Sequence, residues 1–278
     1  MNIEITLEDL LKNGSHFGHN KKRWNPKMGK FIYGEKNGTH ILDLRKSLPL
    51  LENSIKFAFE SAKQNKKFLF VSTKKQHSDL VKTIAEETNN FYVNFRWLGG
   101  MLTNWNTVKK SINTLQEYEA ILESDENLFT KKELGDIEKK KIRLDKTLGG
   151  IREMKNTPDV VFIIDTNKEH IAVLEAKKLG IPIIAIIDTN CDPDPINYPI
   201  PANDDGVKSV QFILENFSKV IKLSSDQKDI SSDQKDLSTE KGDTVTPEKG
   251  DTATPEKVDT LTPEIMEKVL KEGESKDV

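Results

Sequence analysis

The chain of 278 residues lacks several features that mark specialised classes of protein. Cys191 is its only cysteine, which excludes a disulfide framework and a zinc site built from several thiolates, and which suits a reducing cytosol. Its longest apolar runs, Val160–Ile164 and Ile181–Ile187, fall far below the roughly 18 residues that span a bilayer. The N-terminus carries neither a secretory nor a mitochondrial presequence pattern. We therefore expect a cytoplasmic protein with no membrane partner.

Motifs for nucleotide binding and catalysis are also missing. Gly29–Lys36 has the glycine spacing of a phosphate-binding loop, but Glu35 stands where that loop needs lysine. His16 and His19 are spaced as a pair of metal ligands, yet no nearby residue completes a zinc site, and no triad spacing accompanies Cys191. These absences predict no catalytic residue, no cofactor and no small-molecule substrate.

Charge is unevenly distributed, although the formal net charge of the whole chain is only −3. Residues 1–112 hold 19 basic and 10 acidic side chains, a net of +9. Residues 224–278 hold 8 basic and 15 acidic side chains, a net of −7. Positive charge concentrated in one part of a chain indicates a polyanionic partner.

The acidic segment 224–278 consists of short polar repeats. SSDQKDI is followed directly by SSDQKDL, and GDTVTPEK by GDTATPEK, with no aromatic residue after Phe217. Repeats without bulky apolar residues bury too little surface to offset the entropy lost on ordering. We therefore expect one globular domain over 1–223 and a disordered, low-complexity tail over 224–278.

Within 1–223, apolar runs of strand length alternate with amphipathic helical segments. This alternation is typical of an α/β domain, in which crossover helices join the strands of a mostly parallel sheet. The expected strands are Phe68–Val71, Phe91–Asn94, Val160–Ile164, Ile183–Ile187 and a short one near Tyr198–Ile200.

Three helix starts match the capping box, in which a Thr hydroxyl and a Glu or Gln side chain satisfy free backbone N–H groups. They are Thr73–Gln76, Thr166–Glu169 and Thr130–Glu133. The first two precede helices expected over Leu80–Glu87 and Ile171–Leu179.

An inserted segment, 104–149, interrupts the alternation. Apolar residues recur at helical spacing over Asn106–Glu123 and Leu134–Leu148, on either side of the polar residues 124–127. Two helices with narrow apolar stripes and a short polar turn predict an antiparallel coiled-coil hairpin. Such an arm buries little of itself, which suits docking on a partner.

Acidic residues follow two of the expected buried strands. Asp165 and Asp188 end these strands, and Asp204 and Asp205 come later. In doubly wound sheets such residues can hold Mg²⁺ for phosphate chemistry, which would make the chain an enzyme. Asp and Asn also form the turns that strand ends need, and the surrounding turn formers favour this interpretation. A structural Mg²⁺ at Asp188, Asp204 and Asp205 stays open.

Two segments fit nucleic acid better than any motif fits catalysis. Lys21–Lys30 supplies five cations for phosphates and one indole for stacking, and Arg96–Trp105 interleaves tryptophans with Arg, Asn and Thr. Both suit contact with the backbone of folded RNA. Trp97 can also be read as an apolar anchor of the hairpin, with Arg96 and Asn104 exposed. The candidate RNA-binding residues are Lys21, Lys22, Arg23, Trp24, Lys27, Lys30, Arg96, Trp97, Asn104 and Trp105.

At these residues the sequence resembles the bacterial ribosomal protein S-two family of the small ribosomal subunit. The matching blocks run in family order across about 1–223, and the Arg-Trp-Leu-Gly-Gly block is the most specific of them. They include His16–His19, Trp24–Met28, Phe95–Trp105, Leu148–Ile151 and Ile200–Asp205.

The resemblance implies a flavodoxin-like three-layer domain carrying a coiled-coil hairpin, and a structural, non-enzymatic role in translation. It implies a place between the head and body of the small subunit, in contact with 16S ribosomal RNA and neighbouring ribosomal proteins. It also implies a part in docking the mRNA-delivery protein S-one. The tail lies outside the resemblance. The alternative to an RNA-binding protein is an adaptor that binds other proteins through its hairpin. In that case the basic patch is merely solvated.

Overall fold

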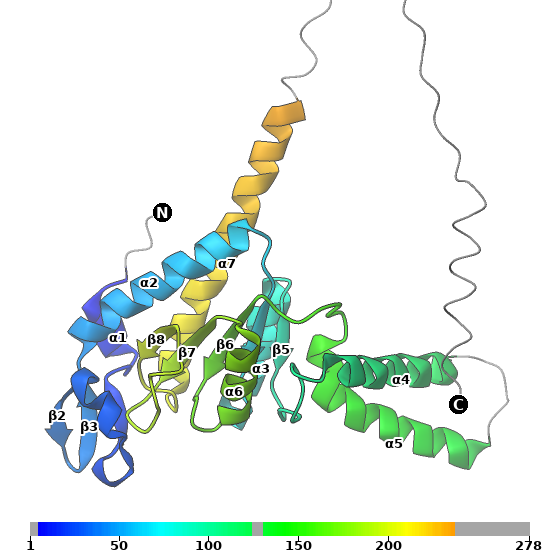
Figure 1. Ribbon diagram of the computed structural model, residues 1–278, viewed down its shortest axis with the longest axis horizontal. Coiled ribbons are helices and arrows are strands. Elements are labelled where there is room, and N and C mark those ends of the chain that lie inside the picture. Colours follow the sequence, from blue (N-terminus) through cyan, green and yellow to red (C-terminus); the bar gives the residue numbers. More distant parts are fainter. Residues whose placement is uncertain (1–4, 124–129, 237–278) are drawn as a thin grey trace, which may run out of the picture. The chain divides into compact units, whose positions relative to one another are not determined.

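A five-stranded parallel sheet lies at the centre of the structure, a computed structural model that describes residues 5–123 and 130–236 (Figure 1). Its strand order, β5-β4-β6-β7-β8, confirms the α/β fold expected from the sequence. All five expected strands are present within one residue of their predicted ends. They are β4 (Phe68–Val71), β5 (Phe91–Val93), β6 (Val160–Ile164), β7 (Ile183–Ile187) and β8 (Tyr198–Pro201).

Helices cover both faces of this sheet and make three layers. Successive side chains of a strand point to opposite faces, so Phe68 and Phe70 join one apolar cluster while Leu69 and Val71 join the other. The first cluster contains side chains of α2 (Leu44–Lys63), α3 (Ser78–Glu87) and α7 (Val207–Asp236). The second contains side chains of α6 (His170–Leu179) and of the inserted hairpin.

Aromatic side chains fill the first cluster. The ring of Phe70 lies 5.5 Å from that of Phe162, which meets Phe217 of α7 edge-on at 4.9 Å. All three rings are fully buried, and burial of each is worth about 1.5–3 kcal/mol. This packing joins α7 to the sheet and makes residues 207–224 part of the domain.

A second, smaller sheet was not predicted. It is antiparallel with the order β1-β3-β2, and two short 3₁₀ helices, η1 and η2, connect β1 to β2. Its strands are short and only partly buried, so they carry no clear alternation of apolar and polar residues. The elements are β1 (Phe17–Asn20), η1 (Lys21–Arg23), η2 (Pro26–Phe31), β2 (Ile32–Lys36) and β3 (Thr39–Leu42).

Gly18 allows this small sheet to approach the large one. A Cβ atom at Gly18 would lie 2.6 Å from the Thr189 side chain and 3.1 Å from the Asp188 carboxylate, just past the end of β7. The backbone N–H of Asn25 also donates to the Thr189 carbonyl at 2.7 Å. The region between β1 and β2 is therefore held against the carboxyl ends of the parallel strands.

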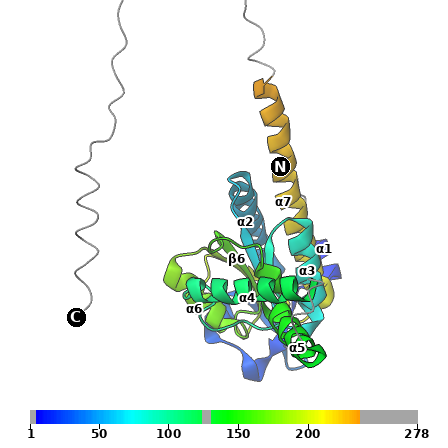
Figure 2. The same cartoon turned by 90° about the vertical axis from the view of Figure 1, so that its right-hand side faces the viewer.

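The inserted hairpin forms as an antiparallel pair of helices, α4 (Trp105–Glu123) and α5 (Lys131–Leu148), which lie side by side (Figures 1 and 2). The capping box at Thr130 is confirmed, because its hydroxyl accepts from the Glu133 N–H and the Glu133 carboxylate accepts from the Thr130 N–H. The polar turn expected at 124–127 lies outside the described residues. The coiled-coil winding of the pair stays a prediction.

The other two capping boxes do not form. A 3₁₀ helix, η3 (Lys75–His77), precedes α3, and the helices α3 and α6 both lack a side-chain cap. The Glu169 carboxylate instead accepts from the N–H and hydroxyl of Thr73. Because β4 and β6 are neighbours, their ends lie side by side, and Glu169 ties the two strand ends together rather than capping its own helix.

Helix α7 continues to Asp236, past the domain boundary expected after residue 223. Residues 237–278, which carry most of the expected disordered tail, lie outside the described residues. Two short helices, α1 (Leu7–Lys12) and η4 (Gly149–Ile151), complete the described elements. Within the described part of the chain, we find no helix with the length and apolarity needed to cross a membrane.

Candidate nucleic-acid interface and strand-end cluster

The first cationic segment folds into η1 and η2, between β1 and β2. The Asn20 side chain accepts from the Lys22 N–H, and the Asn25 side chain accepts from the Lys27 N–H, each at 3.0 Å. These caps turn the backbone tightly, and the basic side chains between them are exposed. Trp24 is 41% exposed, and its ring lies 5.4 Å from that of His40.

The five cations of this segment are not equally free. Lys22 and Arg23 form no ion pair with any residue in the described ranges. Lys21 lies 2.9 Å from Glu35. Lys27 lies between the carboxylates of Asp192 and Asp194, and its hydrogen bonds to them raise its pKa.

Lys30 of the same segment is exposed, and its ammonium lies 4.9 Å from the centroid of the Phe31 ring. Lys22, Arg23 and Lys30 therefore present the least compensated positive charge of this segment, and Lys27 the most compensated.

The second predicted segment is the loop between β5 and α4. Arg96 and Asn104 are exposed, as expected, and Trp105 is half-buried with its indole N–H donating to the Lys155 carbonyl at 3.4 Å. Trp97 is only 7% exposed. Its buried ring belongs to the second apolar cluster, so Trp97 anchors the loop and offers no face to a stacking base. This burial favours the interpretation of Trp97 as an apolar anchor over an RNA contact.

One buried carboxylate, Glu175 on α6, organises this loop. Its Oε1 accepts from the Trp97 indole at 3.1 Å and from the Gly100 N–H at 2.8 Å. Its Oε2 accepts from the Leu102 N–H at 2.9 Å and from the N–H and hydroxyl of Thr103 at 3.1 and 3.2 Å. Glu175 therefore satisfies five donors of a loop that has no regular secondary structure of its own.

The pKa of Glu175 reflects this arrangement. Burial alone would raise it, but the hydrogen bonds from Thr103, Trp97, Leu102 and Gly100 outweigh burial and hold the pKa below its usual value. Sequence reasoning missed Glu175. The available signal was its place on the buried face of α6, among Ala172, Val173 and Ala176, where an acidic residue needs a partner.

The structure does not bring the two cationic segments together. The first lies with the small sheet beside the ends of β7 and β8, whereas the second leads from β5 at the opposite edge of the parallel sheet into the hairpin (Figure 1). No hydrogen bond or ion pair that we find within the described residues joins them. Any surface that uses both segments must extend across the carboxyl ends of the strands.

The acidic residues at those strand ends surround a lysine. The Lys74 ammonium lies 2.8 Å from Asp165, 3.0 Å from Asp204 and 2.8 Å from Asp205. Burial alone would lower the pKa of Lys74, but the carboxylates of Asp204, Asp165 and Asp205 raise it above its usual value. Lys74 thus holds the position between these carboxylates that a magnesium ion would need in the enzyme interpretation.

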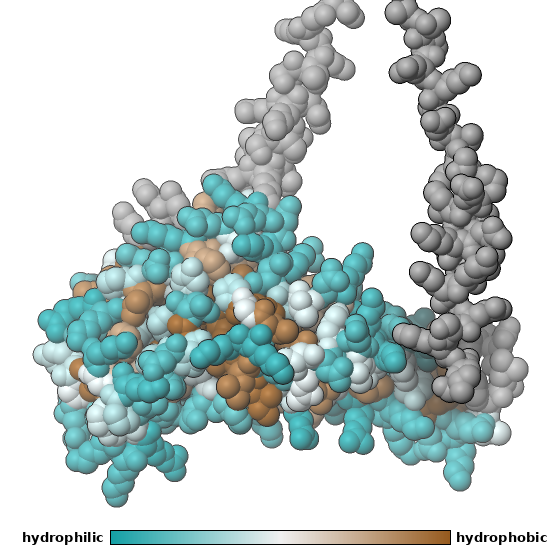
Figure 3. All heavy atoms as spheres, in the orientation of Figure 1, coloured by the Kyte–Doolittle hydropathy of each residue, from teal (hydrophilic) through white to brown (hydrophobic). Residues whose placement is uncertain are grey.

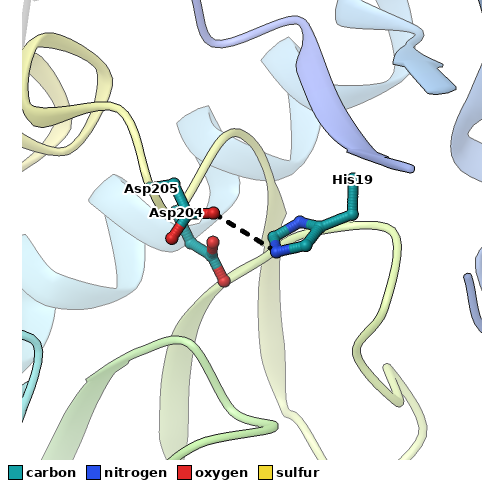
Figure 4. Close-up of side chains that lie close together, drawn as sticks. All are labelled: His19, Asp204 and Asp205. Atoms are coloured by element: carbon teal, nitrogen blue, oxygen red, sulfur yellow. Dashed lines mark ion pairs between the residues drawn. The ribbon is translucent and has the colours of Figure 1, made fainter. Parts of the chain in front are cut away.

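His19 of β1 reaches into the same cluster. Its Nδ1–H donates to the Asp188 carboxylate at 2.7 Å, and its Nε2 lies 3.3 Å from Asp205 (Figure 4). The hydrogen bond to Asp188 raises the pKa of His19 to about 9. Burial, followed by the nearby carboxylates of Asp165 and Asp188, raises the pKa of Asp204 to about 7.

Asp165 has the turn-forming role that the sequence favoured. Its backbone has a φ of +66°, and its carboxylate accepts from the N–H groups of Asn167 and Lys168. This geometry defines the class of the protein. It is a three-layer α/β protein in which a lysine and a histidine bind the carboxylates at the strand ends.

Comparison with known proteins gives the family. The family model described as Ribosomal protein S2 matches residues 10–224. The small ribosomal subunit protein uS2 of Wolbachia pipientis (strain wPip) is 58% identical over 210 residues, which cover 75% of this chain and 78% of that protein. The uS2 protein of Brucella ovis is 50% identical over 207 residues, 74% of this chain and 82% of that protein. The uS2 protein of Bartonella henselae is 48% identical over 216 residues, which cover 78% of this chain and 84% of that protein.

The chain therefore belongs to the ribosomal protein S2 family, as its sequence blocks suggested. Members of this family are structural proteins of translation and not enzymes, so the magnesium-dependent enzyme interpretation is set aside.

Proposed function

We propose that this protein binds 16S ribosomal RNA between the head and body of the small subunit, in the cytoplasm, as a structural component in contact with neighbouring ribosomal proteins. The observation that carries the proposal is the exposed segment of η1 and η2. It presents Lys22, Arg23 and Lys30 with little internal compensation, next to the exposed indole of Trp24. Cations for phosphates beside a flat ring for stacking suit contact with folded RNA.

Rigidity supports the same proposal. Asn20 and Asn25 cap the two 3₁₀ helices, and Gly18 holds β1 against the ends of the parallel strands. At the second segment, Glu175 fixes the loop that exposes Arg96 and Asn104. A backbone that is held in place before binding loses less conformational entropy when it meets a preshaped RNA surface.

Sedimentation of a cell lysate through a gradient that contains Mg²⁺ tests this function. We expect the protein in the small-subunit fractions, and we expect ribonuclease treatment to shift it to the top of the gradient because its main partner is RNA. Free ribosomal proteins from the same lysate serve as the reference for the top fractions. An assembly with proteins that survives ribonuclease would support the adaptor alternative instead.

We propose in addition that this protein helps to dock the mRNA-delivery protein S-one. Exposed apolar side chains gather over α6 on the face drawn in Figure 3. Leu174 is 63% exposed, Ile171 42% and Leu179 44%, with Phe95 of the β5–α4 loop 57% exposed. An exposed apolar surface of this kind suits a protein partner rather than RNA.

We expect Leu174→Asp to reduce the amount of S-one on isolated small subunits several-fold, because a carboxylate would be buried without a partner in the contact. The measurement is the ratio of S-one to this protein on purified subunits. Leu11→Asp on α1, where the side chain is 55% exposed, is the matched control. An unchanged ratio, or the same loss with the control, would rule out α6 as the docking surface.

We do not extend the proposal to a structural Mg²⁺ at Asp188, Asp204 and Asp205. Mg²⁺ prefers an octahedral shell of oxygen atoms. Lys74 and His19 already contact an oxygen of each of these carboxylates, so the cluster offers few of the oxygens that this ion needs.

A further inference from the structure

Three side chains that are far apart in the sequence converge at the ends of β7 and β8 (Figure 4). His19 comes from β1, and Asp204 and Asp205 come from the turn between β8 and α7. One donor atom of each lies within 4.8 Å of the donor atoms of the other two. We propose that His19, Asp204 and Asp205 bind one transition-metal ion of the zinc class. None of these three residues is among those proposed to contact RNA.

An unpartnered oxygen points to a missing ligand. Lys74 binds Oδ1 of both Asp204 and Asp205. Oδ2 of Asp204 has no hydrogen-bond partner within the described residues, although the Asp204 side chain is fully buried. A buried carboxylate oxygen without a partner costs free energy, which a cation at this position would recover. The Oδ1 atoms therefore bind Lys74, whereas Oδ2 of Asp204 lacks a partner and Oδ2 of Asp205 faces His19 Nε2.

Asp188 orients the histidine as metal sites require. The Nδ1–H of His19 donates to the Asp188 carboxylate at 2.7 Å, and the His19 backbone N–H donates to the Thr189 hydroxyl at 2.9 Å. Because Nδ1–H donates to Asp188, loss of the other ring proton leaves Nε2, which faces Asp205, as the atom that can bind a metal. Histidine ligands in metal sites usually donate their other ring nitrogen to a carboxylate in this manner.

The donor set favours zinc over magnesium. Imidazole nitrogen together with carboxylate oxygen suits zinc and its neighbours, whereas magnesium prefers oxygen alone. Zinc binds these atoms at about 2.0–2.2 Å in tetrahedral geometry, which places two ligand atoms about 3.3 Å apart. His19 Nε2 and Asp205 Oδ2 are separated by 3.3 Å. Three protein ligands leave the fourth position for water.

A competing set shares Asp204. One donor atom from each of Asp165, Cys191 and Asp204 also lies within 4.8 Å of the others. However, the Asp165 carboxylate already binds Lys74 and two backbone N–H groups, and the Cys191 side chain is fully buried. The unpartnered Asp204 oxygen is common to both sets, but only the set that contains His19 has a partly exposed ligand, Asp205, through which an ion can enter.

Titration of the purified full-length chain with Zn²⁺ against a fluorescent chelator tests the site. We expect one equivalent to bind, and we expect Mg²⁺ at the same concentration to give no competition. His19→Gln and Asp205→Asn should each weaken binding at least about 10-fold, and Asp188→Asn about 10- to 100-fold. His170→Gln and Asp194→Asn, exposed residues outside the cluster, are the matched controls and should leave the affinity unchanged.

Two further measurements keep the result decisive. Circular dichroism shows whether each variant is folded, and Asp205, which is 57% exposed, is the ligand whose loss perturbs folding least. The absorption spectrum of the Co²⁺ form should show nitrogen and oxygen ligands and should be unchanged in Cys191→Ser. Absence of Zn²⁺ binding would overturn the proposal. So would equal affinity in the folded Asp205→Asn variant, or a cobalt–thiolate band that Cys191→Ser removes.

Discussion

Replacing Glu175 by alanine is expected to lower the free energy of unfolding by about 3–5 kcal/mol, because removing one partner of a buried charged network leaves the others unsatisfied. Two of its five donors, the Trp97 indole N–H and the Leu102 N–H, are buried and would have no other acceptor in place. Each buried donor without a partner costs about 1–3 kcal/mol. Urea unfolding followed by Trp fluorescence measures the loss.

Two control variants separate this effect from a general loss of charge. Glu175→Gln keeps one carbonyl acceptor and should fall between the wild type and alanine. Glu52→Ala, on the exposed face of α2, should change the free energy of unfolding by no more than about 0.5 kcal/mol. Equal effects of Glu175→Ala and Glu52→Ala would show that the loop does not depend on the carboxylate.

The pH dependence of stability provides a check on the same carboxylate. In the folded protein the pKa of Glu175 is lowered from the ordinary glutamate value of 4.5. The stabilisation is therefore fully present above pH 4.5 and is lost as the pH falls through the lowered native pKa. In Glu175→Gln this part of the acid sensitivity should disappear. An identical acid profile in both proteins would contradict the predicted shift.

Replacing Lys21, Lys22 and Arg23 together by alanine should weaken binding to 16S ribosomal RNA on the order of 10²-fold at low salt. Each phosphate contact releases counterions, so three lost contacts should also reduce the slope of log affinity against log salt by about 2–3. Filter binding or fluorescence anisotropy over 50–200 mM salt, with the same RNA throughout, gives both quantities. A smaller change would be expected from Lys21 alone, because Glu35 already binds it.

A matched triple variant makes this prediction specific. Lys139, Lys140 and Lys146 are exposed on α5, and replacing them by alanine removes the same charge from the hairpin. If η1 contacts the RNA, the hairpin variant should lose much less affinity and keep the salt slope. Equal losses in both variants would mean that net charge alone, and not the η1 surface, governs binding.

The sequence by itself determined the elements whose signal is local. All five strands of the parallel sheet are apolar runs of strand length, and the hairpin helices carry stripes at helical spacing. The capping box of Thr130 and Glu133 formed as the sequence predicted. Exposure of Arg96 and Asn104 was expected from the sequence, whereas burial of Trp97 was one of two interpretations that the sequence left open.

Only the tertiary structure decided which distant groups meet. Glu175 accepts from residues more than 70 positions away, and Glu169 bonds to Thr73 across two neighbouring strands instead of capping its own helix. Lys74 and His19 reach the strand-end carboxylates for the same reason. A parallel sheet brings the ends of strands together in an order that local sequence patterns do not encode, so buried polar groups find partners that spacing along the chain cannot reveal.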